Sequence, residues 1–559
     1  MKKNKGFTLV ELIAVVVIIG LILLIVFPAT SRLMSDNEEK EYQTYYDLVE
    51  KAVELYSRNK KDDIGGTNGE GCVQDDSDMK ISNLIKEEYV KKFTNDSNVE
   101  CLSPGDFTAA ELSAAGIDAS QYADMVFENK NGVVTTEFSM ICKKRNKPKI
   151  YFSKLIPKKS PCNRYVAEAT NSLIKSITTG TTAISASVLS GNDYTVSGSA
   201  TNNYVWYSGK MWRIVGYNSV DRTVKLVTDD LVSIVTYDAS SSDFRSSNIG
   251  TWLNNTFLNS LNNPNRYILD TSWNYTTMNN ASTAPTATNL YTSKVGMLNL
   301  YEYDKIKGFL DKGANFWLLS KKDNGKAWYV SSSNTESTSN VNEFYGVRPS
   351  IVLRPSVAIV SGGQGTINNP YKLIGDSAAN IGTPLNTRYP GEYVNINGST
   401  FRIIERNSNY TRLVAVNALN VADIQFHYFH KVYSDDTYIG EYLVKTWATP
   451  INDKLVEGDF CRMLLTKDMA QTSQCPTQDI LRMKVAIPKI GDMYTTTSNK
   501  AYWTLTNSEE EKLFVVNPQA TLGSNGIEDY AAIRPVINLK SNVKIGSGNG
   551  TAANPYTIQ

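Results

Sequence analysis

The sequence has few of the residues that enzyme and metal sites usually need. It has only two histidines, His427 and His430. A spacing of three would suit one face of a helix, but the aromatic and β-branched neighbours favour a strand, in which the two rings point to opposite faces. No Gly-x-Ser-x-Gly elbow, P-loop or dinucleotide-binding fingerprint is present. We therefore predict no catalytic residue, no metal site and no cofactor, and we do not expect an enzyme.

Net charge is also small, because 57 lysines and arginines nearly balance 56 acidic residues. Such a balance gives no overall attraction to nucleic acid or to a charged membrane surface. One turn is strongly basic and contains no acid: Lys143, Lys144, Arg145, Lys147 and Lys149. It either contacts a polyanion, such as DNA or a cell-wall polymer, or is a solvated hairpin tip. The scarcity of aromatic stacking residues there favours the tip.

Cysteine is scarce as well, and none of the six cysteines forms the CxxC pair that zinc sites use. An even number allows three disulfides if the chain is exported, and reduced thiols are the alternative. Proximity in the sequence favours three pairs: Cys72 with Cys101, Cys142 with Cys162, and Cys461 with Cys475.

The sequence does have a long apolar run at its start. A short cationic stretch precedes residues 7–27, which are apolar except for Thr8, Gly20 and the carboxylate of Glu11. These 21 residues would form a helix of about 31 Å, enough to cross a hydrocarbon core of about 30 Å. We predict a single membrane-spanning helix with its lysine-rich end in the cytoplasm.

Glu11 is the informative residue of this helix. A carboxylate at this depth costs at least ~2.5 kcal/mol on insertion scales and needs a cationic partner. No cation of the same helix face is within reach, since Lys5 lies more than one turn away. A partner from a neighbouring chain is the simplest explanation.

Residues 5–12, KGFTLVEL, resemble the N-terminus of type IV prepilins. The resemblance implies cleavage between Gly6 and Phe7 and N-methylation of Phe7. It also implies that the freed amino group neutralises Glu11 of an adjacent subunit, and Pro28 lies where such pilins often carry a helix-softening proline. A signal peptide or a plain signal anchor has the same basic-then-apolar order. Neither explains both Glu11 and the Gly6–Phe7 junction.

After a leader of residues 1–6, the resemblance implies a long helix over residues 7–60. Beyond Pro28 an apolar stripe recurs at steps of three and four residues, with charges between its members: Tyr42, Tyr45, Val49, Ala52 and Tyr56. We predict that this stripe packs on a globular head.

The head is expected over residues 61–177. Residues 81–90 have the pattern of a short amphipathic helix, and residues 132–141 and 149–152 have that of strands around the basic turn. A helix on a small antiparallel sheet would fit this order. Residues 178–200 are rich in Ser, Thr, Gly and Ala and are interpreted as a linker or an extended edge segment.

The rest of the chain is a tandem repeat of one sequence unit, and we expect two domains, over residues 201–375 and 385–559. Four motifs recur in the same order, at offsets that drift only from 189 to 185 residues; they begin at residues 204 and 393, 316 and 502, 347 and 533, and 365 and 550. A period this long indicates a duplicated domain rather than a solenoid.

Each copy is predicted to open with a hairpin, whose turn holds Gly209 or Gly398, and to continue through a short helix into further strands. The fold class is therefore α+β: a long N-terminal helix on an antiparallel-sheet head, followed by two strand-rich α+β repeats. The copies resemble an uncharacterised repeat domain of Gram-positive surface proteins, with a distant likeness to C-type-lectin-like domains.

Several residues of the repeats are candidates for ligand contact. Arg348 and Arg534 each precede a proline, and we favour a structural role in which they bind loop carbonyls. We also expect three tryptophans in the core: Trp212, Trp317 and Trp503. Residues 272–275 and 327–329 each contain two aromatic residues that look exposed, and these are better candidates for contact with carbohydrate or protein.

The resemblance implies a type IV pilus subunit, and the bulk of the two repeats favours a minor or tip pilin that displays them for adhesion. Its partners would be other pilin subunits, a prepilin peptidase, the assembly machinery in the membrane and an unknown surface ligand. It would be a single-pass membrane protein before assembly and extracellular afterwards. Alternatives are a pseudopilin of a DNA-uptake or type II-like secretion apparatus, and a membrane-anchored surface hydrolase whose carboxylates meet only on folding.

Overall fold

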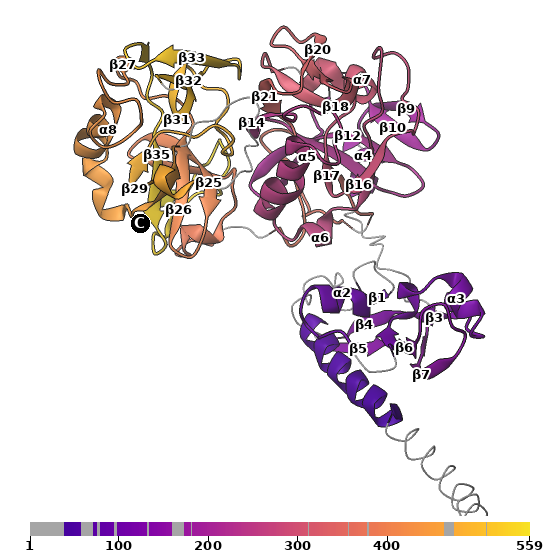
Figure 1. Cartoon of the computed structure of the whole chain (residues 1–559). Coiled ribbons are helices and arrows are strands. Elements are labelled where there is room, and N and C mark those ends of the chain that lie inside the picture. Colours follow the sequence, from indigo (N-terminus) through magenta and orange to yellow (C-terminus); the bar gives the residue numbers. More distant parts are fainter. Residues whose placement is uncertain are drawn as a thin grey trace, which may run out of the picture. The chain divides into compact units, whose positions relative to one another are not determined.

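The computed structural model describes most of the chain in two compact units, Met1–Glu168 and Ala169–Gln559. The described residues are 38–57, 71–74, 79–93, 98–130, 133–158, 173–179, 182–198, 200–310, 312–355, 357–376, 380–462, 475–509 and 511–559. Both units combine helices with mainly antiparallel sheets, which confirms the predicted α+β class (Figure 1).

No helix among the described residues is long and apolar enough to cross a membrane. The predicted span of residues 7–27 lies outside the described residues, and so do four residues that carried the prepilin resemblance: Gly6, Phe7, Glu11 and Pro28.

The first described helix, residues 38–57, packs its apolar stripe on the head. All five predicted stripe residues are at most 6% exposed, which confirms that interpretation. Tyr46 joins them and stacks on Phe138, with ring centroids 4.4 Å apart. Leu48 and Leu55 lie on the outer face and are half exposed. Burial of one stripe is what docks this helix, because isolated short helices are only marginally stable.

The head has two three-stranded antiparallel sheets (Figure 1). The first contains β1 (Gly71–Gln74), β4 (Met125–Lys130) and β5 (Val133–Phe138), and the second contains β2 (Glu100–Leu102), β6 (Met140–Lys143) and β7 (Ile150–Lys154). A small pair joins β3 (Tyr122–Ala123) to β8 (Ile156–Pro157). The helices are α2 (Ile81–Lys86), shorter than the predicted 81–90, and α3 (Ala109–Ser113), whose capping box uses Thr108 and Glu111.

The second unit begins with α4 (Leu173–Thr178) and the hairpin of β9 (Ala186–Ser190) and β10 (Asp193–Val196). The segment expected as a linker or edge therefore adds two strands to the edge of the next sheet. That sheet has the order β17-β22-β13-β12-β10-β9, and β11 also pairs with β12. Its other strands are β11 (Tyr204–Tyr207), β12 (Lys210–Asn218), β13 (Val224–Thr228), β17 (Val295–Gly296) and β22 (Ser350–Leu353), with β23 (Tyr371–Lys372) parallel to β11.

A second sheet of this region has the order β14-β21-β18-β19-β20. Its strands are β14 (Ser233–Thr236), β18 (Phe316–Asp323), β19 (Lys326–Val330), β20 (Glu336–Asn340) and β21 (Phe344–Val347). A small pair contains β15 (Thr271–Asn274) and β16 (Leu290–Ser293), and the helices are α5 (Asn248–Trp252), α6 (Pro264–Tyr267) and α7 (Leu300–Leu310).

The C-terminal region has a sheet of order β24-β25-β26-β35-β30, which is the same as the order β11-β12-β13-β22-β17 of the preceding region. Its strands are β24 (Tyr393–Ile396), β25 (Ser399–Arg406), β26 (Tyr410–Ala415), β30 (Val485–Ala486) and β35 (Val536–Lys540). A further sheet contains β31 (Tyr502–Glu509), β32 (Lys512–Val516) and β33 (Leu522–Gly526). Shorter strands pair as β27 (Ile424–Gln425) with β34 (Tyr530–Ala531), β28 (Gly458–Cys461) with β29 (Ile480–Met483), and β36 (Ile545–Ser547) with β37 (Thr557–Ile558).

The opening hairpins of the two regions have the same turn. Ser208 and Gly209 have φ of 54° and 72°, and Asn397 and Gly398 have φ of 49° and 78°. Two successive residues with positive φ make the turn that matches the twist of paired strands, and glycine adopts this conformation without steric cost.

The short helices α5 and α8 (Tyr438–Tyr442) also begin alike, with Ser247 or Thr437 accepting a hydrogen bond from the glycine three residues on. Each continues into a single π-helical segment, Leu253–Phe257 or Leu443–Trp447. A Cβ on Gly250 would lie 2.1 Å from the carbonyl oxygen of Phe244, and one on Gly440 would lie 1.9 Å from that of Ser434. Only glycine fits at either position.

Arg348 and Arg534 hold equivalent loops from inside, as predicted. The Arg348 guanidinium donates to the carbonyl oxygens of Thr228, Asp229 and Leu310. That of Arg534 donates to backbone carbonyls of the matching loops, Ala415, Thr496 and Tyr494. Burial lowers the pKa of Arg348 to about 10, so it stays charged at neutral pH. The three predicted core tryptophans are also buried.

Candidate functional site

The basic turn of the head lies between β6 and β7, and its cations have partners. Lys143 is buried and donates to the carbonyl oxygen of Glu111 at 3.3 Å. Arg145 forms an ion pair with Glu100 at 2.7 Å. Lys144 and Lys149 lie over the ring of Tyr151.

Glu111 contacts the same turn, because its Oε1 accepts from the backbone N–H of Asn146. Hydrogen bonds from Thr108 are the largest cause that lowers the pKa of Glu111 to about 2, and the bond from Asn146 acts in the same direction. One acid distant in sequence thus pairs with Arg145, and the ring of Tyr151 lies under Lys144 and Lys149. Of the five basic residues, Lys147 is the one whose side chain has no recorded contact among the described residues, and it is exposed.

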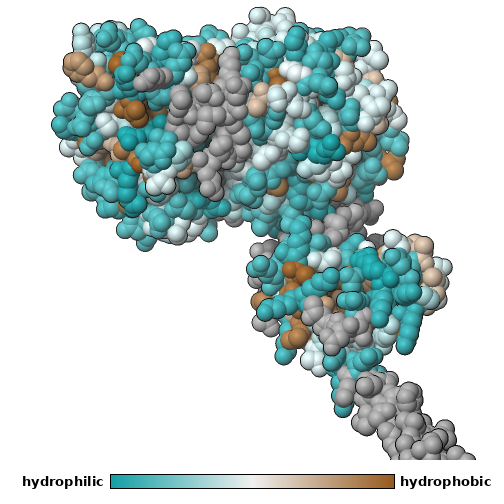
Figure 2. Space-filling view, viewed as in Figure 1, coloured by the Kyte–Doolittle hydropathy of each residue, from teal (hydrophilic) through white to brown (hydrophobic). Residues whose placement is uncertain are grey.

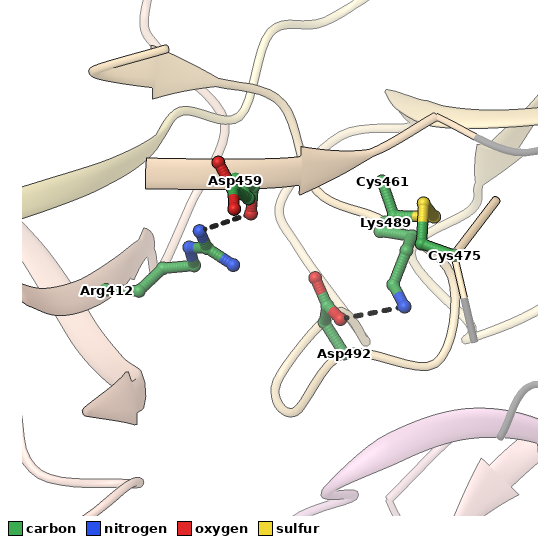
Figure 3. The surroundings of a disulfide bond; sticks show 6 residues. All are labelled: Arg412, Asp459, Cys461, Cys475, Lys489 and Asp492. Atoms are coloured by element: carbon green, nitrogen blue, oxygen red, sulfur yellow. Dashed lines mark hydrogen bonds and ion pairs between the residues drawn. A yellow bond between two sulfur atoms is a disulfide. The ribbon is translucent and has the colours of Figure 1, made fainter. Parts of the chain in front are cut away.

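The disulfide pairing differs from the prediction in the head. Cys101 is bonded to Cys142, with their Cα atoms 4.0 Å apart, so both predicted pairs of the head, Cys72 with Cys101 and Cys142 with Cys162, are wrong. The reason is the sheet, in which Cys101 of β2 lies directly opposite Cys142 of β6. Cys72 is also disulfide-bonded, and Cys162 lies outside the described residues. The third predicted pair, Cys461 with Cys475, is confirmed (Figure 3).

The two histidines lie in a loop after β27, so the predicted strand is wrong. Their ring centroids are 4.4 Å apart, because the chain turns back between them. The turn forms because Nδ1 of His427 accepts from the backbone N–H groups of Phe429 and His430. Burial is the main cause that lowers the pKa of His427, and the nearby His430 ring acts in the same direction. Among the described residues no group of three or more His, Cys, Asp or Glu side chains is arranged to hold a metal ion.

The aromatic residues predicted for ligand contact are mostly buried. Trp273 is 2% exposed and Tyr275 3% exposed, so they belong to the core. Trp273 also covers Gly296, where a Cβ would lie 2.2 Å from the indole ring. Trp328 and Tyr329 are half-buried, and the Trp328 indole donates to the carbonyl oxygen of Met278. The pattern of aromatic residues among polar ones was typical of a surface, but strand pairing turned these rings inward.

The two sequence-related regions of the second unit are joined by polar contacts. Nζ of Lys210 donates to the carbonyl oxygen of Pro390 at 2.7 Å, and the Tyr389 hydroxyl donates to Asn262 at 2.7 Å. Arg402 forms an ion pair with Asp230 at 3.1 Å. Apolar residues from both regions also pack together, as in the pair of Phe344 and Phe514 with ring centroids 5.4 Å apart.

Several charged groups are buried at this junction. Burial lowers the pKa of Lys210 to about 7, with the nearby Arg402 guanidinium acting in the same direction. Burial raises the pKa of Asp376, whose carboxylate accepts from the backbone N–H of Ser208 and from Asn262. Burial also raises the pKa of Glu392, although Arg388 donates to it at 2.6 Å. Unmatched charges in such a place would be costly, so these groups fix how the regions dock.

A cleft of about 600 Å³ opens beside this junction, and its volume is within the usual range for small-molecule sites. One wall comes from the segment that contains α5, and the other comes from β25 and the loop after β30. The lining residues are Trp252, Thr256, Asn259, Ser260, Pro390, Ile404, Glu405, Arg406, Lys489, Gly491, Asp492 and Met493.

The charged groups of the cleft differ in how firmly they are held. Glu405 accepts from Arg412 at 2.8 Å and from the Tyr410 hydroxyl at 2.9 Å. Lys489 and Asp492 point toward one another, with 3.5 Å between Nζ and Oδ1 (Figure 3). Arg406 donates to a backbone carbonyl at 3.3 Å and lies over the ring of Tyr389. Among the described residues no carboxylate forms an ion pair with Arg406.

Sequence reasoning missed this cleft, because its residues come from segments far apart in the chain. The usable signal was the comparison of the two copies, in which Arg406 replaces Tyr217 and Lys489 replaces Asn299. These are matching positions: β12 and β25 carry the same bulge two residues after their buried arginines. In addition, Leu298 and Pro488 accept equivalent backbone hydrogen bonds.

Comparison with known proteins finds one family model, the prokaryotic N-terminal methylation motif, which matches residues 1–27. The N-terminus is type IV pilin-like. The motif indicates a type IV pilin or pseudopilin that interacts with other pilins and with a prepilin peptidase, and that is anchored in a membrane before it reaches the surface. No curated protein and no solved structure matches the chain.

Proposed function

We propose that this chain is a large minor or tip subunit of a type IV pilus, which assembles through its N-terminal helix and displays the second unit for adhesion. The methylation motif at residues 1–27 carries the proposal. Glu11 supports it, since a carboxylate in a membrane helix is best explained by a cation from a neighbouring subunit. We expect the amino group of Phe7, created by cleavage after Gly6, to be that cation.

The second unit is, in this proposal, a tandem duplication of a Gram-positive surface-protein domain. Its support is the repeated strand order, the equivalent arginine clamps and the equivalent core tryptophans. The indole N–H of Trp317 donates to the carbonyl of Val235, and that of Trp503 donates to the carbonyl of Ile424. The visible face of this unit is mainly hydrophilic with scattered hydrophobic residues, as suits a domain exposed to solvent (Figure 2).

We favour a pilus over a DNA-uptake or secretion pseudopilus. The basic turn was the reason to consider DNA, and three of its cations have partners in the head: Arg145 pairs with Glu100, and Lys144 and Lys149 lie over the ring of Tyr151. We also propose binding rather than hydrolysis at the cleft. Its two carboxylates, Glu405 and Asp492, each have a cationic partner from the chain itself.

The test is N-terminal mass spectrometry of the protein isolated from its own cells, combined with immunogold labelling of filaments. We expect a mature chain that begins at N-methylated Phe7 and label at or near filament ends. A mature chain that begins after Ala29 would contradict the proposal.

A matched pair of variants tests the role of the buried carboxylate. Glu11→Ala should still be cleaved but should be lost from the filament fraction. Glu41→Ala should enter filaments normally, because Glu41 lies on the exposed face of the described helix. Equal incorporation of both variants would show that Glu11 does not direct assembly.

A further inference from the structure

The cleft exists because one copy lacks what covers the same place in the other. In the first copy β10 pairs with the end of β12, with Thr195 opposite Gly216 and Tyr194 opposite Tyr217. Tyr194 and Tyr217 stack with ring centroids 4.9 Å apart. Among the described strands β25 pairs only with β24 and β26, so its end has no such cover. Glu405 and Arg406, at the matching positions, line the cleft instead.

A second difference between the copies places another cation on the opposite side of the cleft. In the first copy Asn299 caps α7 by accepting from the backbone N–H of Glu302. No helix follows the matching residue of the second copy, Lys489, which lines the cleft. The loop there returns toward the first copy, where the Asp492 carbonyl accepts from the Ser233 hydroxyl at 3.1 Å. Both cations of the cleft thus occur at positions where the copies diverge.

Arg406 determines the sign of the charge that a ligand of this cleft carries. Its guanidinium has five N–H donors in a planar fork, which suits carboxylate or sulfate groups. Its hydrogen bond to the carbonyl oxygen of Asn386 and its contact with the ring of Tyr389 leave N–H donors available for a ligand. Glu405 cannot neutralise it fully, because Glu405 is already paired with Arg412.

The remaining lining determines the kind of molecule. Thr256 and Asn259 are exposed and offer a hydroxyl and an amide group on one wall, which suit hydroxyl-rich ligands. The Ser260 hydroxyl beside them is buried and donates to the carbonyl oxygen of Phe257. Trp252 and Met493 also line the cleft, but they are only 3% and 8% exposed, so the polar groups supply most of the surface open to a ligand.

We propose that this cleft binds a short oligosaccharide that carries a carboxylate or sulfate group, with Arg406 as the anion contact and Lys489 as a second cation. The inference rests on the proposed adhesive function in naming a surface glycan as the ligand. Binding by the purified chain does not depend on filament assembly. A negative result for glycan binding can therefore be told apart from a negative result for the pilus-subunit proposal.

The experiment is calorimetric titration of the full-length mature chain in detergent micelles. Three tetrasaccharides serve as probes: a hyaluronan fragment bearing carboxylates, a heparin fragment bearing sulfates, and neutral chitotetraose. At least one acidic probe should bind about tenfold or more tightly than the neutral probe, and the stronger of the two identifies the anionic group. An acidic tetrapeptide of glutamate is the competing probe.

Single substitutions test whether the acidic sugar binds in the cleft. Arg406→Gln should weaken the acidic probe by about tenfold or more, while Asp492→Asn should strengthen it by releasing Lys489. Arg482→Gln is the matched control, because Arg482 does not line the cleft and its side chain is 67% exposed. Thermal unfolding of each variant checks that it is folded, and Asp492→Asn still tests the proposal if Arg406→Gln does not fold.

Three results would overturn the proposal. The first is no binding of any sugar at about 1 mM, or equal binding of the neutral one. The second is tighter binding of the glutamate peptide than of both acidic sugars, which would indicate a protein partner. The third is a folded Arg406→Gln variant, or an Asp492→Asn variant, that binds like the unaltered chain.

Discussion

At the scale of single residues, the second unit uses buried cations to hold backbone loops. Arg348, Arg534 and Lys210 all donate to carbonyl oxygens that lie far away in the sequence. Carbonyl groups without partners would be costly inside a protein, and a long cationic side chain satisfies several at once. Lys210 differs from the arginines, because its ammonium group loses its proton much more readily on burial.

Because Lys210 is buried, we predict that the free energy of unfolding rises with pH. Its pKa is about 7 in the folded chain and 10.5 in the reference state, so between these values the unfolded chain binds a proton that the folded chain does not. The free energy of unfolding should therefore rise from pH 7 toward pH 9, by up to about 1.4 kcal/mol per pH unit from this group. Below pH 7 both states are protonated and this contribution becomes flat.

The measurement is chemical unfolding of the full-length chain at several pH values from 6 to 9. Lys210→Met should flatten the dependence, and Lys445→Met, at an exposed site, should leave it unchanged. If Lys210→Met keeps the slope of the unaltered chain, the buried amine is not its source.

At the scale of elements, pairing between strands decides what the sequence spacing cannot. β2 and β6 are neighbours although a long stretch of chain separates them, and this brings Cys101 and Cys142 face to face. The same disulfide lies in the core under the helix of residues 38–57. It therefore links two strands of the core cluster that this helix joins.

Removal of this disulfide should destabilise the head more than removal of the other one destabilises its own region. The paired cysteines are 41 residues apart for Cys101–Cys142 and 14 apart for Cys461–Cys475. Each double substitution to alanine should cost about 2 to 5 kcal/mol, with the longer loop costing about 1 kcal/mol more. Thermal unfolding followed by circular dichroism would measure both, and the reverse order would contradict the loop argument.

At the scale of the whole molecule, the two copies of the second unit share a hydrophobic cluster as well as polar contacts. Phe344 and Phe514 meet in this cluster, together with residues such as Tyr303 of the first copy and Tyr502 of the second. A shared cluster couples the unfolding of its parts. The cleft lies beside this junction, so its shape depends on both copies staying docked.

We therefore expect the two copies to unfold together in one calorimetric transition. Phe514→Ala should lower stability by about 3 kcal/mol or more and should split the transition, because it removes a contact across the junction. Phe426→Ala, at a buried site within the second copy, should lower stability but keep one transition. The head, as a separate compact unit, can add a transition of its own. More than one transition from the second unit of the unaltered chain would show that the copies are independent.

Local patterns predicted what local physics controls. The stripe from Tyr42 to Tyr56 was readable because helix periodicity places those residues on one face. Arg348 and Arg534 were readable because the same Arg-Pro motif recurs in both copies. Trp273 and the histidine loop were misread, since burial and loop conformation depend on strands and side chains that are distant in the sequence.

The sequence by itself determined the pilin-like N-terminus, the apolar face of the first described helix and the repeated motifs, because each is a pattern of residues close together in the chain. Only the tertiary structure decided that Cys101 pairs with Cys142, that Glu100 pairs with Arg145 of the basic turn, and that Arg406 and Lys489 line one cleft. The physical reason is that these contacts join segments far apart in sequence. Strand order and register set which residues meet, and no local pattern encodes either.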